Sequence, residues 1–177
     1  MNPFFLYIRI NYRGRIRLII CSFRLIGLLA ALFCCYPVYA QWDTIRYEID
    51  SGGITFSEPL QYTRITFLKP VVFYDDTSKG ADFGFADFKD ETYFRKVTFE
   101  YKADFNKANF RKRADFFDTD FESEAHFSRV GFEGFTYFGY TNFKGETNFS
   151  NTVFDSIANF SFVNFFANTD FQNSTFT

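Results

Sequence analysis

The sequence has little of what catalysis requires. Its 177 residues include one His, His126, and three Cys, which are Cys21, Cys34 and Cys35. Residues 41–177 therefore hold no Cys, and they can form neither a disulfide framework nor a thiolate metal site. The pattern contains no Ser/His/Asp arrangement and no metal-ligand arrangement. The sequence thus predicts a protein that is not an enzyme, with no cofactor and no catalytic or metal-binding residues.

Acidic residues are absent from the first 40 positions, which contain Arg9, Arg13, Arg15, Arg17 and Arg24. Residues 41–177 hold 14 of the 19 basic residues and all 21 acidic ones, so their formal net charge is −7. A chain of that sign repels nucleic acid on average, and no nucleic-acid partner is expected.

Residues 1–40 are predicted to be a signal peptide or a membrane anchor. The segment is basic up to Arg24, and the apolar run LIGLLAALFCC follows at 25–35. Val38 and Ala40 fit the small-residue rule for signal cleavage. This order predicts a hydrophobic targeting helix and an exported protein, which would be periplasmic, on the cell surface or secreted.

Two alternatives remain open for this segment. Residues 16–38 are apolar enough to stay as a membrane-anchoring helix if Arg17 and Arg24 are tolerated. Lipidation at Cys34 or Cys35 is the third option, although neither is preceded by the small residue that lipidation favours. A membrane association is expected only through 16–38, and only if the segment is not cleaved.

Phenylalanine is the abundant residue, and its spacing is regular. From residue 83 onward the steps alternate between five and six, at Phe83, Phe88, Phe94, Phe99, Phe105, Phe110, Phe116, Phe121, Phe127, Phe132, Phe138, Phe143, Phe149, Phe154, Phe160, Phe165, Phe171 and Phe176. The residue two before each Phe is Ala, Thr, Val or Ser, and the residue between is mostly polar. This alternation is typical of a very short strand that points its small residue and its Phe inward. The Phe residues are therefore the predicted core.

An 11-residue repeat is also typical of a right-handed helical coiled coil. On a helix, however, steps of five and six would place Phe in two separate stripes, since each residue turns the helix by about 100°. Phe, Thr, Asn and Asp are also poor helix formers. Short strands joined by corners explain the spacing better.

The segments ADFGFADF (81–88), ADFNKANF (103–110) and TNFKGETNF (141–149) resemble pentapeptide repeat proteins. The resemblance covers about 54–177 and implies an all-β fold, a right-handed quadrilateral β-helix with four units per coil. This chain departs from the plain pattern by one extra residue in every second unit and by Phe at each centre, so a coil would contain about 22 residues.

The domain boundaries follow from this pattern. Residues 41–53 are predicted to be a short capping strand and a turn, and 54–177 to be the solenoid. The segment YDDTSKG at 74–80 has no apolar centre, and it is predicted to be irregular, either as a degenerate side or as a projecting loop.

Residues 22 apart should lie on neighbouring coils, about 4.8 Å from each other. On this geometry Glu91 would stack on Arg113, and Lys102 on Glu124, as two pairs of opposite charge. Outward Asp residues are expected to hydrogen-bond the nearby backbone at corners. The seven cations of 95–113 are expected to form a solvated belt on several faces, and His126 to be a solvated surface residue.

Outward aromatic and aliphatic residues gather near the end of the sequence. They are Phe135, Tyr137, Tyr140, Ile157, Phe162 and Phe166, and they predict an interface. The alternative is that outer positions simply tolerate Phe. Because the repeat continues in register to Phe176, that end is expected to meet a partner such as a second copy, to be the end of a fragment, or to aggregate.

The sequence therefore predicts a non-enzymatic, exported solenoid that serves as a structural or protein-binding module. The alternative is an acidic mimic of DNA that acts on a topoisomerase. The resemblance implies this activity because some members of the family have it, and the net charge of residues 41–177 permits it.

Overall fold

The computed structural model describes residues 4–12, 15–23, 44–45 and 48–177, in two units, Met1–Gln41 and Trp42–Thr177. In the first unit, β1 (Phe4–Tyr12) and β2 (Arg15–Phe23) pair in antiparallel orientation, with Phe4 opposite Phe23. The apolar run at 25–35 lies outside the described residues, so the targeting helix stays a prediction. Within the described residues, no helix is long and apolar enough to cross a membrane.

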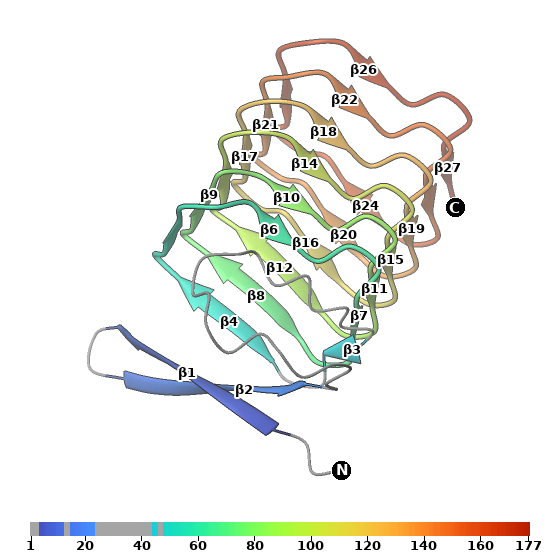
Figure 1. The fold of residues 1–177 in the computed structure, drawn as a ribbon. Coiled ribbons are helices and arrows are strands. Elements are labelled where there is room, and N and C mark those ends of the chain that lie inside the picture. The colour runs from blue at the N-terminus through green and yellow to red at the C-terminus, as the bar shows by residue number, and fades with distance from the viewer. Residues whose placement is uncertain (1–3, 13–14, 24–43, 46–47) are drawn as a thin grey trace. The chain divides into compact units, whose positions relative to one another are not determined.

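The second unit is a parallel β-solenoid with about six coils (Figure 1). Its strands stack into four parallel sheets, which we call sides 1 to 4. Side 1 contains β3 (Thr44–Ile45), β7 (Thr66–Phe67), β11 (Asp87–Phe88), β15 (Asn109–Phe110), β19 (Gly131–Phe132), β23 (Val153–Phe154) and β27 (Thr175–Phe176). Side 2 contains β4 (Ile49–Gly52), β8 (Val71–Tyr74), β12 (Thr92–Arg95), β16 (Ala114–Asp115), β20 (Thr136–Tyr137) and β24 (Ala158–Asn159).

The other two sides complete each coil. Side 3 contains β5 (Thr55–Phe56), β9 (Thr77–Ser78), β13 (Thr98–Phe99), β17 (Asp120–Phe121), β21 (Asn142–Phe143) and β25 (Asn164–Phe165). Side 4 contains β6 (Leu60–Gln61), β10 (Ala81–Asp82), β14 (Ala103–Asp104), β18 (Ala125–His126), β22 (Thr147–Asn148) and β26 (Thr169–Asp170). The chain passes from side 1 to side 4 and then begins the next coil.

The 22-residue coil is confirmed by the strand register. Phe88 pairs with Phe110 on side 1, and Phe99 pairs with Phe121 on side 3. The rings follow the same register: Phe105 stacks on Phe127 with ring centroids 4.9 Å apart and an interplanar angle of 5°. The rings of neighbouring sides meet edge to face, as Phe110 and Phe116 do, or at a tilt, as Phe105 and Phe110 do. Because each ring buries a large apolar area, four columns of Phe fill the interior.

Burial of the predicted core Phe residues changes along the solenoid. The predicted core Phe residues from Phe83 to Phe154 have at most 1% of their surface exposed. Phe160 is partly buried, and Phe165, Phe171 and Phe176, in the last strands, are exposed.

The small inward position accepts Thr as well as Ala because the hydroxyl finds an acceptor. Thr141 is fully buried, and its Oγ1 donates to the carbonyl of Phe116 at 2.6 Å. Thr119 and Thr152 make the same contact with the carbonyls of Phe94 and Phe127. A buried hydroxyl without such a partner would destabilise the fold.

Corners 2–3 and 4–1, where side 2 meets side 3 and side 4 meets side 1, contain a left-handed residue in every coil. At these two corners the residues with positive φ are Gly53, Arg64, Asp75, Phe85, Lys96, Lys107, Asp118, Arg129, Tyr140, Asn151, Phe162 and Asn173. The N–H of Ala86 donates to the carbonyl of Phe83 at 3.0 Å across one such corner, which closes a β-turn. The five-residue step is therefore a tight turn, and the six-residue step is a wider corner.

Outward Asp residues support these turns, as predicted. Asp82 Oδ1 accepts the N–H of Gly84 at 2.9 Å, and Asp104 Oδ1 accepts that of Asn106 at the same distance. Such bonds satisfy the backbone where the strand ends.

The sequence predicts that 74–80 is either a degenerate side or a projecting loop. In the structure this segment contains β9 and forms a side of the coil. β9 pairs with β5 and β13, and Thr77 lies opposite Thr98, 21 residues later. Ser78 occupies a position that other coils give to Phe, and Asp76 occupies the small inward position, 1% exposed. Asp76 Oδ1 accepts the N–H of Ile54 at 2.7 Å, and Oδ2 accepts the hydroxyl of Ser51.

The solenoid begins earlier than the spacing predicts. β3 and β4 lie in 41–53 and pair with β7 and β8 in parallel, as members of the first coil. The sequence predicts one capping strand and a turn in 41–53, because Ile45 and Ile49 are four residues apart and do not fit the five-and-six pattern.

Candidate functional site

Among the described residues, side 2 and its two corners carry a group of outward aromatic residues. They lie together with two arginines and one carboxylate, and we call this group the aromatic–arginine face. Its members are Tyr93, Arg95, Arg113, Asp115, Phe117, Phe135, Tyr137, Tyr140, Ile157 and Phe162. The outward positions of β12, β16 and β20 supply Tyr93, Asp115 and Tyr137, since the residues on either side of each one point into the core.

The aromatic rings of this face contact one another from coil to coil. Phe117 stacks on Tyr137 with centroids 5.7 Å apart, and it meets Tyr140 edge to face at 5.6 Å. Tyr140 stacks on Phe162 at 4.8 Å. Because residues at the same corner are one rung apart, the outer rings form a ladder parallel to the inner columns.

The end of this ladder is exposed to solvent. Phe162 is 70% exposed and Tyr140 is 48% exposed, and Ile157, which lies at corner 1–2 on the other edge of side 2, is 69% exposed. An apolar group of this size is unusual on a solvated surface and is typical of a contact with another molecule.

The opposite end of the face is built around Asp115. Its carboxylate is fully buried although it lies at an outward position. Oδ1 accepts the N–H of Phe117 at 3.0 Å, and Oδ2 accepts Nη2 of Arg113 at 2.7 Å. Nε of Arg95 lies 3.8 Å from the same Oδ2, so two guanidinium groups share one carboxylate.

Both guanidinium groups also lie against aromatic rings. Arg95 Cζ is 5.0 Å from the ring centroid of Phe117, and Arg113 Cζ is 5.7 Å from that of Tyr93 and 5.3 Å from that of Phe135. Such cation–π contacts are favourable and hold the planar groups in a fixed orientation.

Tyr93 titrates far from the neutral range. Burial, together with its hydrogen bond to Glu91 Oε2 at 2.5 Å, raises the pKa of Tyr93 to about 12. The phenol therefore stays protonated and donates to Glu91, so it cannot serve as a general base at neutral pH.

The structure brings together five of the predicted interface residues, namely Phe135, Tyr137, Tyr140, Ile157 and Phe162. It does not bring Phe166 or Phe176 to them, because Phe166 follows β25 at the corner of sides 3 and 4, and Phe176 belongs to β27 on side 1.

Sequence reasoning missed Tyr93, Phe117 and Asp115 as members of this face. Phe117 directly follows the core residue Phe116, so it read as part of the repeat. The available signal was position: residues 95 and 117 are 22 apart at the same corner, which places Arg95 beside Phe117.

The two predicted ion pairs are not formed by the described residues. Arg113 bonds Asp115 and not Glu91. Lys102 Nζ lies 3.1 Å from Asp104, and Glu124 lies 3.4 Å from His126 Nε2. Each of these contacts joins residues two apart on one outer surface.

Other charges do pair between residues 22 apart. Lys112 Nζ bonds Asp90 at 2.8 Å and lowers the pKa of that carboxyl, and Lys144 Nζ bonds Glu122 at 2.6 Å. Arg111 bonds Glu133.

The cations of 95–113 lie at all four corners of the coil and form no single groove. Arg95 and Lys96 are at corner 2–3, Lys102 at corner 3–4, Lys107 at corner 4–1, and 111–113 at corner 1–2.

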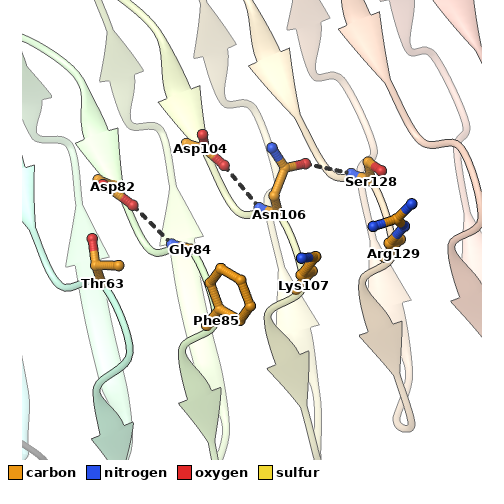
Figure 2. A pocket seen from close by; sticks show the side chains of 9 residues that line it. All are labelled: Thr63, Asp82, Gly84, Phe85, Asp104, Asn106, Lys107, Ser128 and Arg129. Atoms are coloured by element: carbon orange, nitrogen blue, oxygen red, sulfur yellow. Dashed lines mark hydrogen bonds between the residues drawn. The ribbon is translucent and has the colours of Figure 1, made fainter.

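A shallow groove of about 380 Å³ lies beside the corner of sides 4 and 1 (Figure 2). It is lined by Thr63, Asp82, Gly84, Phe85, Asp104, Asn106, Lys107, Ser128 and Arg129. Figure 2 shows that the Asp82 and Asp104 carboxylates bond the backbone of the same corner. Lys107 Nζ lies 4.5 Å from the Phe85 centroid. The polar groups of the groove thus support the turn and neighbouring rungs.

His126 lies on side 4 beside a second depression of about 230 Å³, formed with Glu146, Thr147, Asn148, Asn168, Thr169 and Asp170. Across the described part of the chain, no three His, Cys, Asp or Glu side chains converge as metal ligands would.

Comparison of the chain with protein-family models, with curated proteins and with solved structures finds no match. The proposals below therefore rest on the repeat and on the geometry of side 2.

Proposed function

We propose that this protein is a non-enzymatic solenoid of the pentapeptide-repeat type, right-handed and four-sided, that serves as a protein-binding or structural module. Coils of 22 residues, Phe at each centre and a small inward residue two positions earlier support this assignment. The residues that build the coils leave the outward positions to vary, so recognition would come from one side of the solenoid.

The aromatic–arginine face is the observation that carries a binding role. Tyr, Phe and Arg are enriched at protein interfaces, where a few well-packed side chains supply most of the affinity. On side 2 these residue types are clustered, and the rings are held in position by their neighbours. A surface that is already ordered loses less conformational entropy when a partner binds.

Site-specific photo-cross-linking in the producing cells tests this role. A benzophenone side chain at Phe162 should give a discrete cross-linked protein, since Phe162 is exposed at the end of the ladder. The matched control is Asn151, which has the same left-handed turn position, φ 57° against 58°, at corner 4–1. Equal cross-linking from both positions, or none from Phe162, would refute a binding role for side 2.

Self-association is a separate form of binding that would use β27 on side 1 and not the face on side 2, and Phe176, 57% exposed in β27, is the residue expected to take part. Light scattering of the full chain would show a mass above that of one copy, and a strict monomer would exclude this form.

Export rests on the basic and then apolar order of residues 1–40. Sequencing the N-terminus of the protein from fractionated cells tests it, and a chain that begins at Gln41 outside the cytoplasm is expected.

A DNA mimic that acts on a topoisomerase is the second candidate. The observation in its favour is the acidic group along side 4 and corner 3–4, which includes Asp82, Glu100, Asp104, Glu122, Glu124, Glu146 and Asp170. Several of these carboxylates already pair with Lys79, Lys102 or Lys144. A DNA supercoiling assay with gyrase decides between the candidates, because a mimic inhibits the reaction and a module that binds through side 2 leaves it unchanged.

A further inference from the structure

We infer that the aromatic–arginine face recognises a protein segment that presents a carboxylate a few residues from an apolar side chain. This inference rests on the proposed binding role and specifies the partner's chemistry. It follows from the order of side chains along side 2, where cationic groups occupy the earlier coils and exposed apolar groups occupy the later ones.

The cationic end has unused capacity for a carboxylate. Arg95 and Arg113 share the single carboxylate of Asp115, and Arg95 approaches it no closer than 3.8 Å. A guanidinium carries five N–H donors and binds a carboxylate with two of them at once. The side chains of Arg95 and Arg113 are 42% and 39% exposed, so an incoming carboxylate can reach them.

The two guanidinium groups are also held in place in advance. The ring contacts with Tyr93, Phe117 and Phe135 fix them from the sides. Nε of Arg95 and Nε of Arg113 are buried without a hydrogen-bond partner, which costs free energy in the isolated protein. One guanidinium neutralises the charge of Asp115, so the positive charge of the second guanidinium is available to a ligand.

The distance between the two ends sets the length of the segment. Arg95 lies at the end of β12, and Phe162 lies at the same corner three coils later, after β24. Three rungs correspond to about 14 Å, which an extended peptide spans with about four residues. A carboxylate over Arg95 would therefore place a side chain about four positions away over Phe162 and the Tyr140 ring that stacks on it.

The neighbouring charges favour one carboxylate over a polyanion such as a nucleic acid or an anionic membrane. Lys112 is paired with Asp90, and Arg111 is paired with Asp87 and Glu133. Polyanion binding requires several free cations on one surface. Lys112 and Arg111 at corner 1–2 are therefore neutralised, whereas Lys69 and Lys96 have no ion pair among the described residues, and Lys96 lies 5.9 Å from the ring centroid of Tyr74. The two cations that converge on one carboxylate are Arg95 and Arg113.

A library of random heptapeptides displayed on phage and selected against the full chain tests the inference. The expected consensus has Asp or Glu about four positions from Phe, Tyr, Leu or Ile. A synthetic consensus peptide and its amide counterpart, with Asn for Asp or Gln for Glu, are then compared by fluorescence anisotropy. Loss of one charge-assisted contact should weaken binding by about tenfold or more.

Three variants locate the contact. Arg95→Gln leaves Asp115 bonded to Arg113, so the fold is retained, and the carboxylate peptide should bind about tenfold more weakly. Asp115→Asn removes the competing carboxylate and should strengthen binding. Arg64→Gln is the matched control, because Arg64 lies over the ring of Phe85 at 5.1 Å on corner 4–1, and it should change nothing.

The outcomes separate this inference from the proposed function. Equal affinity for the carboxylate and amide peptides, or equal loss from Arg95→Gln and Arg64→Gln, refutes the inference, while a cross-link at Phe162 still supports a protein partner. Binding of phosphatidylglycerol vesicles that the peptide does not compete for also refutes it. Absence of both a consensus and a cross-link refutes both.

Discussion

Replacing Asp118 with glycine should stabilise the solenoid. Asp118 has φ 55° at corner 2–3, and its side chain is exposed. A left-handed conformation costs an L-residue about 1–2 kcal/mol, because Cβ approaches the following carbonyl oxygen. Glycine has no Cβ, so this strain disappears.

Glycine also loosens the unfolded chain, which opposes the gain by about 0.4–1 kcal/mol. The free energy of unfolding should therefore rise by about 0.5–1 kcal/mol for Asp118→Gly. Asp118→Val should lower it by about 1 kcal/mol or more, because a β-branched residue is strained further at positive φ. The backbone N–H of Asp118 donates to the carbonyl of Gly139 at 2.9 Å, and neither variant removes that bond.

The matched control is Asp155→Gly. Asp155 is also exposed, but it lies at corner 1–2 and is not among the residues with positive φ. At that position glycine relieves no strain and only increases the conformational freedom of the unfolded chain. The free energy of unfolding should therefore fall by about 0.5–1 kcal/mol.

Urea denaturation followed by circular dichroism measures these differences, and the midpoints are compared at equal m-values. If Asp118→Gly lowers stability as much as Asp155→Gly does, the left-handed turn is not a source of strain. The reasoning then fails for every residue at these corners. If it holds, adding Asn151→Gly should give a second gain of similar size, because the two residues lie at different corners, 2–3 and 4–1.

Phe127→Ala should lower the free energy of unfolding by about 3–5 kcal/mol, since its ring is fully buried. Phe176→Ala should lower it by only about 1 kcal/mol, because that ring is 57% exposed. Equal losses in urea denaturation would refute the column geometry. Thr141→Val keeps the shape but removes the hydrogen bond to Phe116, so a loss of about 1–2 kcal/mol is expected in the same assay, and no loss would mean that the bond does not stabilise the turn. Burial raises the pKa of Asp76 above 3.8, so the folded state holds this proton more tightly than the unfolded state. As the pH rises from 3.8 through the folded pKa, the wild type should lose stability relative to Asp76→Asn, and a difference that is independent of pH would contradict this.

The coil length could be predicted from the sequence because one residue type marks every side. Each Phe of the five-and-six series from Phe83 onward is the inward residue of a side, and no insertion disturbs the spacing. The register of neighbouring coils then follows from counting, and the pairing of Phe99 with Phe121 agrees with it.

The partners of the charged side chains could not be predicted by the same counting. Outward residues two apart lie on one face of a strand, so Arg113 has Asp115 within reach as well as Glu91 on the preceding coil. Asp115 prevails because a buried carboxylate gains more from a guanidinium than an exposed one does. Repeat spacing reports neither burial nor side-chain direction, so the cationic half of side 2 emerged only from the structure.

The shortened coil that contains β9 also determines how the chain aligns with itself. From Phe83 onward, residues 22 apart carry the same inward side chains, so a chain displaced by one whole coil would still bury Phe against Phe. Ser78 and Asp76 have no such equivalents. If the coils paired one whole coil out of register, Asp76 would no longer accept hydrogen bonds from the Ser51 hydroxyl and the N–H of Ile54. Its carboxylate would then be buried without partners. This polar pair therefore distinguishes the native alignment from displaced ones, which the repeating columns of rings cannot do.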